Sequence, residues 1–248
     1  MLTWEICAVK LNIIGVFLFI ASTNLFAQDL SNNTYPKGSE ELYDQYTKAI
    51  GKSGRLFNGH EYSFEDFQNG GHPFSGRKMF HSERLIYDGF TYESVEIMYD
   101  IYRDQIVMAH NDENGNFARI ALYSEKAMAF TLRGNQFIRL EGSGQTPPSG
   151  DGFYEILYSD QLVVLAKREK KLRPSSNGGY TFEFYQTDQF YLKKDGFFYH
   201  IKSKNDFYKP FSSNKKLMKA YARQSGVNRM NLEYFIIFLA EYYDVLKK

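Results

Sequence analysis

Cysteine is almost missing from this sequence of 248 residues, since Cys7 is its only one. Cys7 precedes an apolar run, whereas the lipid-modified cysteine of a lipoprotein must follow such a run, so a lipid anchor is not expected. If the N-terminus is removed, as argued below, the mature chain has no thiol and forms no disulfide. This excludes thiol catalysis and cysteine metal sites, and stability must come from a hydrophobic core.

Motifs for nucleotide and nucleophile chemistry are missing as well. There is no phosphate-binding loop, no dinucleotide fingerprint and no Gly-x-Ser-x-Gly elbow of a hydrolase. Carboxylates are abundant, but a glycosidase needs two of them held roughly 5–9 Å apart across a cleft, and the sequence does not show which carboxylates face each other. We therefore predict no catalytic residue and no cofactor.

The N-terminus has the layout of a secretory signal peptide. A polar lead covers residues 1–10, an apolar run covers 13–20, residues 22–24 are polar, and Ala27 is a small residue at a suitable cleavage distance. The alternative is a retained anchor, but a membrane-spanning helix needs roughly 20 apolar residues. We expect cleavage after Ala27, no stable transmembrane anchor, and export to the periplasm or the extracellular space.

The mature chain, 28–248, has the length and composition of a single β-rich domain. Tyrosine (20) and phenylalanine (22) are both abundant, and aromatic residues favour half-buried strands. Charge is uneven along the chain. Residues 29–158 contain 12 basic and 19 acidic residues, whereas 159–248 contain 17 and 9. We favour two halves that pack with complementary charge over a basic face for an acidic polymer or a membrane surface.

Turn residues predict a series of hairpins from 56 to 211. Asp88-Gly89 and Asp195-Gly196 each lie between two apolar runs, and both residues of such a turn can adopt positive φ. Similar pairs of strands flank the polar segments near residues 111–116, 134–135 and 159–160, and residues 180–185 add another strand. Short turns make neighbouring strands antiparallel, and a wide meander must curl. The predicted fold class is mainly β, an antiparallel meander curled into a roll or an open barrel.

Helices are predicted at both ends of this meander. Residues 39–50 have a Ser39 cap, acidic residues in the first turn and an apolar face. Residues 213–225 and 231–246 form two C-terminal helices, separated by Gly226. The last helix is apolar on all sides, so we expect it to be buried on more than one side, packed on the sheet or plugging one end of it.

Three histidines in a loop-prone stretch are the first metal candidate. His60, His72 and His81 have Glu61 and Glu83 beside them. Metal ligands must converge on one point, and these spacings match no helical or hairpin pair that guarantees convergence. We predict loop or surface histidines and no metal.

A calcium loop is the second metal candidate. Asp112, Asn114 and Asn116 alternate as at the start of such a loop. Its sixth position should be glycine and is Phe117, and its twelfth should be acidic and is Tyr123. We predict a polar hairpin turn here.

A basic cluster covers residues 167–173 at the end of a predicted strand. With the many tyrosines it is compatible with nucleic-acid binding, but export argues against a nucleic-acid partner. We therefore predict a solvated strand end.

Seven segments of the sequence are informative when they are taken together: 56–62, 71–74, 87–89, 98–102, 152–158, 190–204 and 241–246. With these segments the chain resembles a group of secreted proteins of Gram-negative bacteria that have no established activity. The resemblance implies export and supplies no catalytic residues.

These observations favour a non-enzymatic envelope protein that binds an envelope protein or a hydrophobic, lipid-like ligand. The alternative is a periplasmic hydrolase that acts on envelope glycans or lipids. A deep pocket with converging acidic groups would favour the enzyme. A wide apolar cavity would favour a lipid carrier, and a filled interior would favour a protein-binding module.

Overall fold

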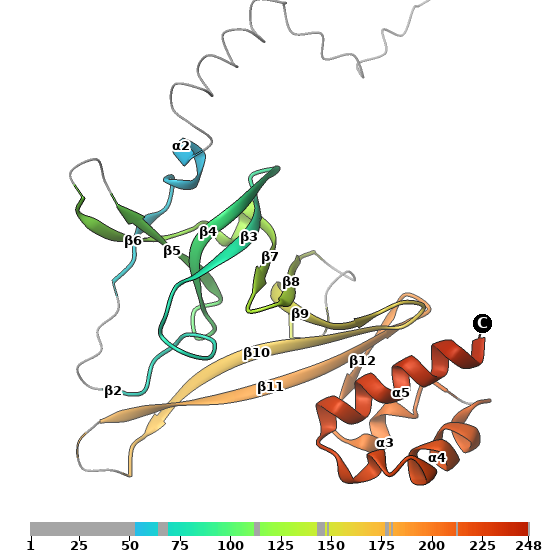
Figure 1. The fold of residues 1–248 in the computed structure, drawn as a ribbon. Coiled ribbons are helices and arrows are strands. Elements are labelled where there is room, and N and C mark those ends of the chain that lie inside the picture. Colours follow the sequence, from blue (N-terminus) through green and yellow to red (C-terminus); the bar gives the residue numbers. More distant parts are fainter. Residues whose placement is uncertain are drawn as a thin grey trace, which may run out of the picture. The chain divides into compact units, whose positions relative to one another are not determined.

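A wide antiparallel sheet forms most of the computed structural model, which describes residues 53–63, 69–111, 115–142, 147, 149–176, 179, 181–211 and 213–247 (Figure 1). The predicted signal peptide and the helix at 39–50 lie outside these residues, and the domain limits 28–248 stay a prediction. The strands are β1 (His60–Glu61), β2 (Asn69–Gly70), β3 (His81–Tyr87), β4 (Phe90–Asp100), β5 (Gln105–Asn111), β6 (Phe117–Ala121), β7 (Ala127–Leu132), β8 (Asn135–Leu140), β9 (Gly152–Ser159), β10 (Val163–Pro174), β11 (Phe182–Lys194) and β12 (Phe197–Ile201).

The strands pair in the order β1-β6-β5-β4-β3-β7-β8-β9-β10-β11-β12, and β2 adds a short parallel pairing to β11. This confirms the predicted fold class: a mainly β, antiparallel, open sheet. It consists of two meanders, β3–β6 and β7–β12, because β7 pairs with β3 and not with β6. The sheet curls until the turn after β4 meets the free edge of β10, where the Lys170 N–H donates to the Ile101 carbonyl at 3.0 Å.

The Asp-Gly hairpins form as predicted. Asp88 and Gly89 have φ values of 50° and 79°, and Asp195 and Gly196 have 51° and 82°. Both turns therefore have two consecutive residues at positive φ, which matches the right-handed twist of the flanking strands. The separate strand expected at 180–185 is wrong, because it is continuous with the next one as β11.

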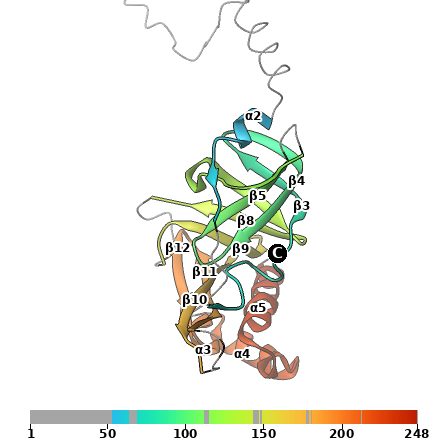
Figure 2. The same cartoon turned by 90° about the vertical axis from the view of Figure 1, so that its left-hand side faces the viewer.

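Among the described residues, one helix precedes the sheet in the chain and three follow it. They are α2 (Ser53–Leu56), α3 (Lys204–Phe207), α4 (Lys215–Gln224) and α5 (Leu232–Lys247), with 3-10 turns η1 (Ser124–Lys126) and η2 (Val227–Arg229). The two predicted C-terminal helices are confirmed as α4 and α5. Asn231 caps α5 by accepting a hydrogen bond from the Tyr234 N–H at 2.8 Å, and Gly226 has φ 75° between the helices. Figures 1 and 2 both show α3, α4 and α5 beside strands β10–β12.

Two large hydrophobic cores are filled by side chains. The first, which we call the β core, lies on β3–β5 and β7–β9, where the Tyr99 ring contacts the Phe130, Phe137 and Phe153 rings at centroid distances of 5.2–5.8 Å. The second, which we call the helical core, joins β10–β12 to the three C-terminal helices. Its fully buried members include Leu192 and Phe235.

The last helix was expected to be buried on more than one side, but it is buried only on the side that faces the sheet. Phe235, Leu239 and neighbouring residues of α5 are buried against the sheet. On the other side, Tyr234 and Val245 are 55% and 69% exposed. A helix that is apolar on all sides therefore leaves part of its apolar surface in solvent.

Candidate functional site: a polar cleft around Arg168

The candidate site lies where the two cores meet on the inner face of the sheet. Successive side chains of a strand point to opposite faces, so Val164, Ala166 and Arg168 of β10 share one face. Val164 and Ala166 belong to the helical core. Arg168 is the next residue on that face, and it lies just beyond the edge of this core, where apolar neighbours give way to carboxylates.

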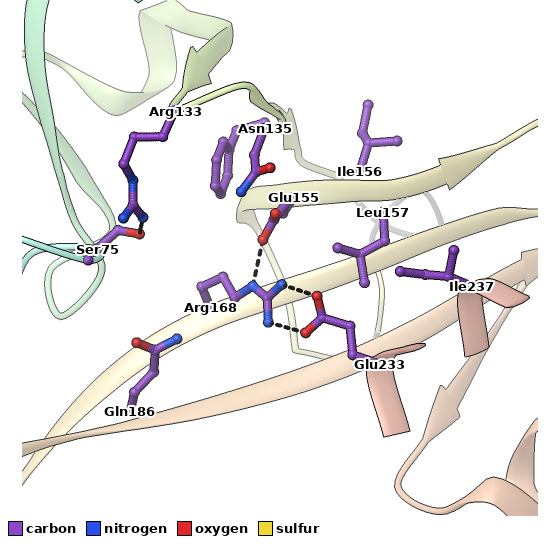
Figure 3. Close-up of a pocket in the computed structure, with 12 residues that line it drawn as sticks. Ser75, Arg133, Asn135, Glu155, Ile156, Leu157, Arg168, Gln186, Glu233 and Ile237 are labelled. Atoms are coloured by element: carbon purple, nitrogen blue, oxygen red, sulfur yellow. Dashed lines mark hydrogen bonds and ion pairs between the residues drawn. The ribbon is translucent and has the colours of Figure 1, made fainter. Parts of the chain in front are cut away.

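The guanidinium of Arg168 is bound by three carboxylates from three elements, and Figure 3 shows two of them, Glu155 and Glu233. Its Nε donates to Glu155 Oε2 of β9 at 2.5 Å, and its Nη1 donates to Asp188 Oδ2 of β11 at 2.8 Å. Glu233, in the first turn of α5, accepts two parallel bonds, each of 2.9 Å. Arg168 therefore ties the start of α5 to three adjacent strands.

Burial and charge act in opposite directions on Arg168. Burial disfavours its cation, but the hydrogen bonds to Glu233 and Glu155 and the charge of Asp188 outweigh that effect and raise the pKa of Arg168. The side chains of Arg168 and Glu155 are only 12% and 7% exposed. Removing the ion-pair partner of either side chain would therefore cost much of the free energy of unfolding.

A polar cleft of about 460 Å³ opens above this ion-pair cluster. Its rim includes Arg133 and Asn135 from the β7–β8 hairpin and Gln186 from β11 (Figure 3). The Arg133 guanidinium donates to Ser75 Oγ at 3.2 Å. It lies so close to Gly76, where φ is 64°, that any side chain at that position would displace it. The cleft thus presents cations, carboxylates and amides to solvent.

A second cluster of polar side chains, centred on Asp104, connects the β4–β5 turn to β10. Asp104 accepts hydrogen bonds from Lys167 Nζ at 2.6 Å, from the Tyr99 hydroxyl at 2.5 Å and from the Phe153 N–H at 3.3 Å. Burial and the adjacent Asp104 raise the pKa of Tyr99. These hydrogen-bonding groups pair with one another inside the fold, so we assign them a structural role.

The prediction of a solvated strand end at 167–173 is wrong for three of its cations. Lys167 is 4% exposed, and Arg168 is held by carboxylates. Lys170 Nζ donates to the carbonyls of His72 and Phe74 at 2.8 and 2.7 Å, and burial lowers its pKa. Alternation with the buried residues of the same strand is the sequence signal that could have placed Arg168 inside.

The three candidate histidines do not share a site. His60 lies in β1 opposite Ala121, His81 lies in β3 opposite Ile97, and His72 lies in the segment between β2 and β3. Within the described parts of the chain, no three His, Cys, Asp or Glu side chains gather in a way that could hold a metal ion. That the protein binds no metal stays a prediction.

The calcium-loop candidate falls between β5 and β6. Asp112 and Asn114 lie outside the described residues. The flanking strands pair antiparallel, with Asn111 opposite Phe117, as expected for a hairpin.

Comparisons with known proteins assign this chain to no family. A scan against family models, a search of curated proteins and a search of solved structures found no match to this chain. Among the described residues, no helix is long and apolar enough to span a membrane.

Proposed function

We propose that this protein is exported to the cell envelope and acts there as a non-enzymatic binding module, with the cleft around Arg168 as its site for a partner protein. The observation that carries the proposal is the position of the Arg168 guanidinium. It occupies the space between Glu155, Asp188 and Glu233, where the substrate of a hydrolase would have to lie. Carboxylates held in this way can present charge to a partner but leave no room for a reacting bond.

The filled interior favours a protein over a hydrophobic ligand. Stacked and edge-on aromatic rings fill the β core, and packed side chains from the sheet and three helices fill the helical core. Three clefts lined by described residues are open to solvent, with volumes of about 460, 520 and 200 Å³. An acyl carrier would need an enclosed apolar cavity.

A photo-cross-linking residue at Gln186, on the rim of the cleft, tests the proposed site. The matched control is the same residue at Met128, which is 60% exposed on β7 and does not line the cleft. Irradiation of intact cells should give a discrete protein adduct from position 186 and none from position 128. Equal adducts from both positions would refute the cleft as the binding site. An acyl lipid that co-purifies in equal amount with the protein would favour a lipid carrier, and release of glycan or lipid products by the purified protein would favour a hydrolase.

Export is tested separately by sequencing the N-terminus of protein isolated from the envelope fraction. We expect the mature chain to start at Gln28. Material that starts at Met1, or protein that is confined to the cytoplasm, would overturn the export proposal.

A further inference from the structure

One edge of β11 has an unpaired stretch in the middle of the strand. β2 pairs with Phe182 and Glu183 near the start of this edge, and β12 pairs with residues 190–194 at its end (Figure 1). Among the described residues, no strand pairs with residues 185–189 at this edge. We call residues 185–189 the open edge. At the usual rise of a strand they span about 17 Å, which gives room for an extended segment of about five residues.

The register of the sheet decides which backbone groups face the open edge. Lys170 of β10 is paired with Gln186, and its N–H donates to the Ile101 carbonyl on the far side of β10. Two residues that face each other on antiparallel strands exchange both of their backbone hydrogen bonds or neither. Gln186 therefore points its N–H and its carbonyl away from β10, and so does Asp188, two residues further along. Both residues are exposed, although the Asp188 side chain itself is only 27% exposed, so the Asp188 backbone reaches solvent.

The chain segments at the two ends of the open edge are held by other contacts. After β2, the carbonyls of His72 and Phe74 accept hydrogen bonds from Lys170 Nζ of β10, at 2.8 and 2.7 Å. After β12, Ser203 caps α3, and its N–H donates to Asp206 Oδ2 at 2.8 Å. Neither segment therefore continues β2 or β12 along the open edge.

We propose that the partner protein binds through an extended segment that pairs with the open edge of β11 and places a lysine or an arginine beside Asp188. This inference rests on the proposed function, because the open edge borders the cleft around Arg168. Gln186 lines that cleft, and Asp188 accepts a hydrogen bond from the Arg168 guanidinium. In strand addition of this kind, main-chain hydrogen bonds supply affinity, and the side chains of the added strand give specificity.

The charges on the inner face favour a basic segment. A partner residue opposite Asp188 would have its side chain on the same face of the sheet as Asp188 and Arg168. On this face, three carboxylates share the single guanidinium of Arg168. The two other cations nearby, Lys170 and Arg133, bind carbonyls and a hydroxyl and form no ion pair with a described residue. A basic side chain from the partner would therefore give the Asp188 carboxylate a second cation.

A second copy of this chain fits the open edge less well. Antiparallel pairing of two open edges would bring the two Asp188 carboxylates onto the same face of adjoining strands, where like charges repel. A basic segment avoids this repulsion and gains from the same carboxylate.

Cross-linking in intact cells tests strand pairing with a reporter placed away from the open edge. A photo-cross-linking residue at Asn135, on the β8 rim of the cleft, gives the yield of the partner adduct. Gln186→Pro should lower this yield at least about tenfold, because it removes an outward N–H and puts a ring where the partner strand would lie. Gln186→Ala removes the same side chain but keeps the N–H, so it should lose clearly less. Asp188→Asn should lower the yield about twofold to fivefold, because it removes the charge that faces the basic residue.

Leu172→Pro is the matched control for the proline variant. It places a proline at the other edge of the β10–β11 ribbon, where Pro174 already occurs two residues further along. Glu93→Gln is the control for Asp188→Asn, because it removes a carboxylate that is 66% exposed on β4. Both controls should leave the adduct yield within about twofold of the parent.

The outcomes separate this inference from the proposed function. An adduct that survives Gln186→Pro, or that Gln186→Ala lowers equally, would refute strand pairing and leave the cleft as the binding site. No adduct from Asn135 or Gln186 in the parent would refute the proposed function itself. Mass spectrometry of the adduct should find lysine or arginine in the cross-linked segment; an acidic segment, an unchanged yield with Asp188→Asn, or a second copy of this chain would overturn the basic partner. If Gln186→Pro does not fold, Asp188→Asn and the composition of the segment decide the question.

Discussion

Replacing Arg168 by methionine should be among the most destabilising changes on the inner face of the sheet. Methionine keeps much of the side-chain length and its apolar stem but removes all four charge-assisted hydrogen bonds. Glu155, which is 7% exposed, then stays buried without a cation. Asp188 and Glu233, at 27% and 33% exposed, can regain part of their hydration.

The expected loss is therefore set mainly by Glu155. Removing one partner of a buried ion pair costs about 3–5 kcal/mol, because the other charge remains desolvated. A whole domain is held by roughly 5–15 kcal/mol, so this is a large share of the total. With a urea dependence near the upper end of about 1–3 kcal/mol per molar, the unfolding midpoint should fall by about 1–2 M.

Arg173→Met is the matched control for this prediction. Arg173 lies on the same strand and pairs with Glu183, but its side chain is 60% exposed. Exposed pairs contribute about 0–1 kcal/mol, so the midpoint should move little. Adding Glu155→Leu to Arg168→Met should recover part of the loss, since it removes the stranded charge. Urea unfolding followed by circular dichroism measures all four proteins, and a loss below about 1 kcal/mol for Arg168→Met would refute the reasoning.

Three further predictions concern other parts of the chain. Phe235→Asp should unfold the domain, because it places an unpaired carboxylate at a fully buried position; a variant that melts like the parent would contradict this assignment. The pKa of Asp206 is lowered to about 2 by hydrogen bonds from Lys209 and Ser203, so its contribution to stability is complete above about pH 4 and is lost as the pH falls towards 2. The parent should accordingly be more stable than Asp206→Asn at neutral pH and should lose that advantage in acid; a constant difference across this range would contradict it. Elemental analysis of untagged protein should find no stoichiometric metal, and a chelator should not change the melting temperature; near-stoichiometric zinc would favour a metal-dependent hydrolase instead.

Local signals in the sequence predicted the hairpins and the helix ends, because turn chemistry acts over a few residues. The pairing of β7 with β3 could not be predicted from such local signals, since either edge of the first meander could accept the next strand. The hairpin signals also did not show that β11 continues through the polar residues Gln186 and Asp188. They continue β11 because their cross-strand partners are Lys170 and Arg168, a pairing that compensates for their low β propensity.

The candidate site was only half visible in the sequence. Residues 167–173 were identified as a basic cluster, and the opposite charges of the two halves of the chain predicted complementary packing. Lys167–Asp104 and Arg168–Glu155 are contacts of that kind between the two halves. The choice of partners could not be predicted, because Glu155 and Glu233 reach Arg168 only after β9, β10 and α5 have come together.

The helical core has a consequence for the order in which the chain is made. Its strand residues, such as Val164 and Leu192, leave the ribosome before Phe235 and Leu239, which cover them from α5. A nascent chain that stops short of α5 has its β10–β11 ribbon complete but its apolar inner face uncovered. A chain that exposes this apolar surface is prone to aggregation. Completion of the helical core therefore waits until α5 has been synthesised, and the inner face of the β10–β11 ribbon stays without its cover until then.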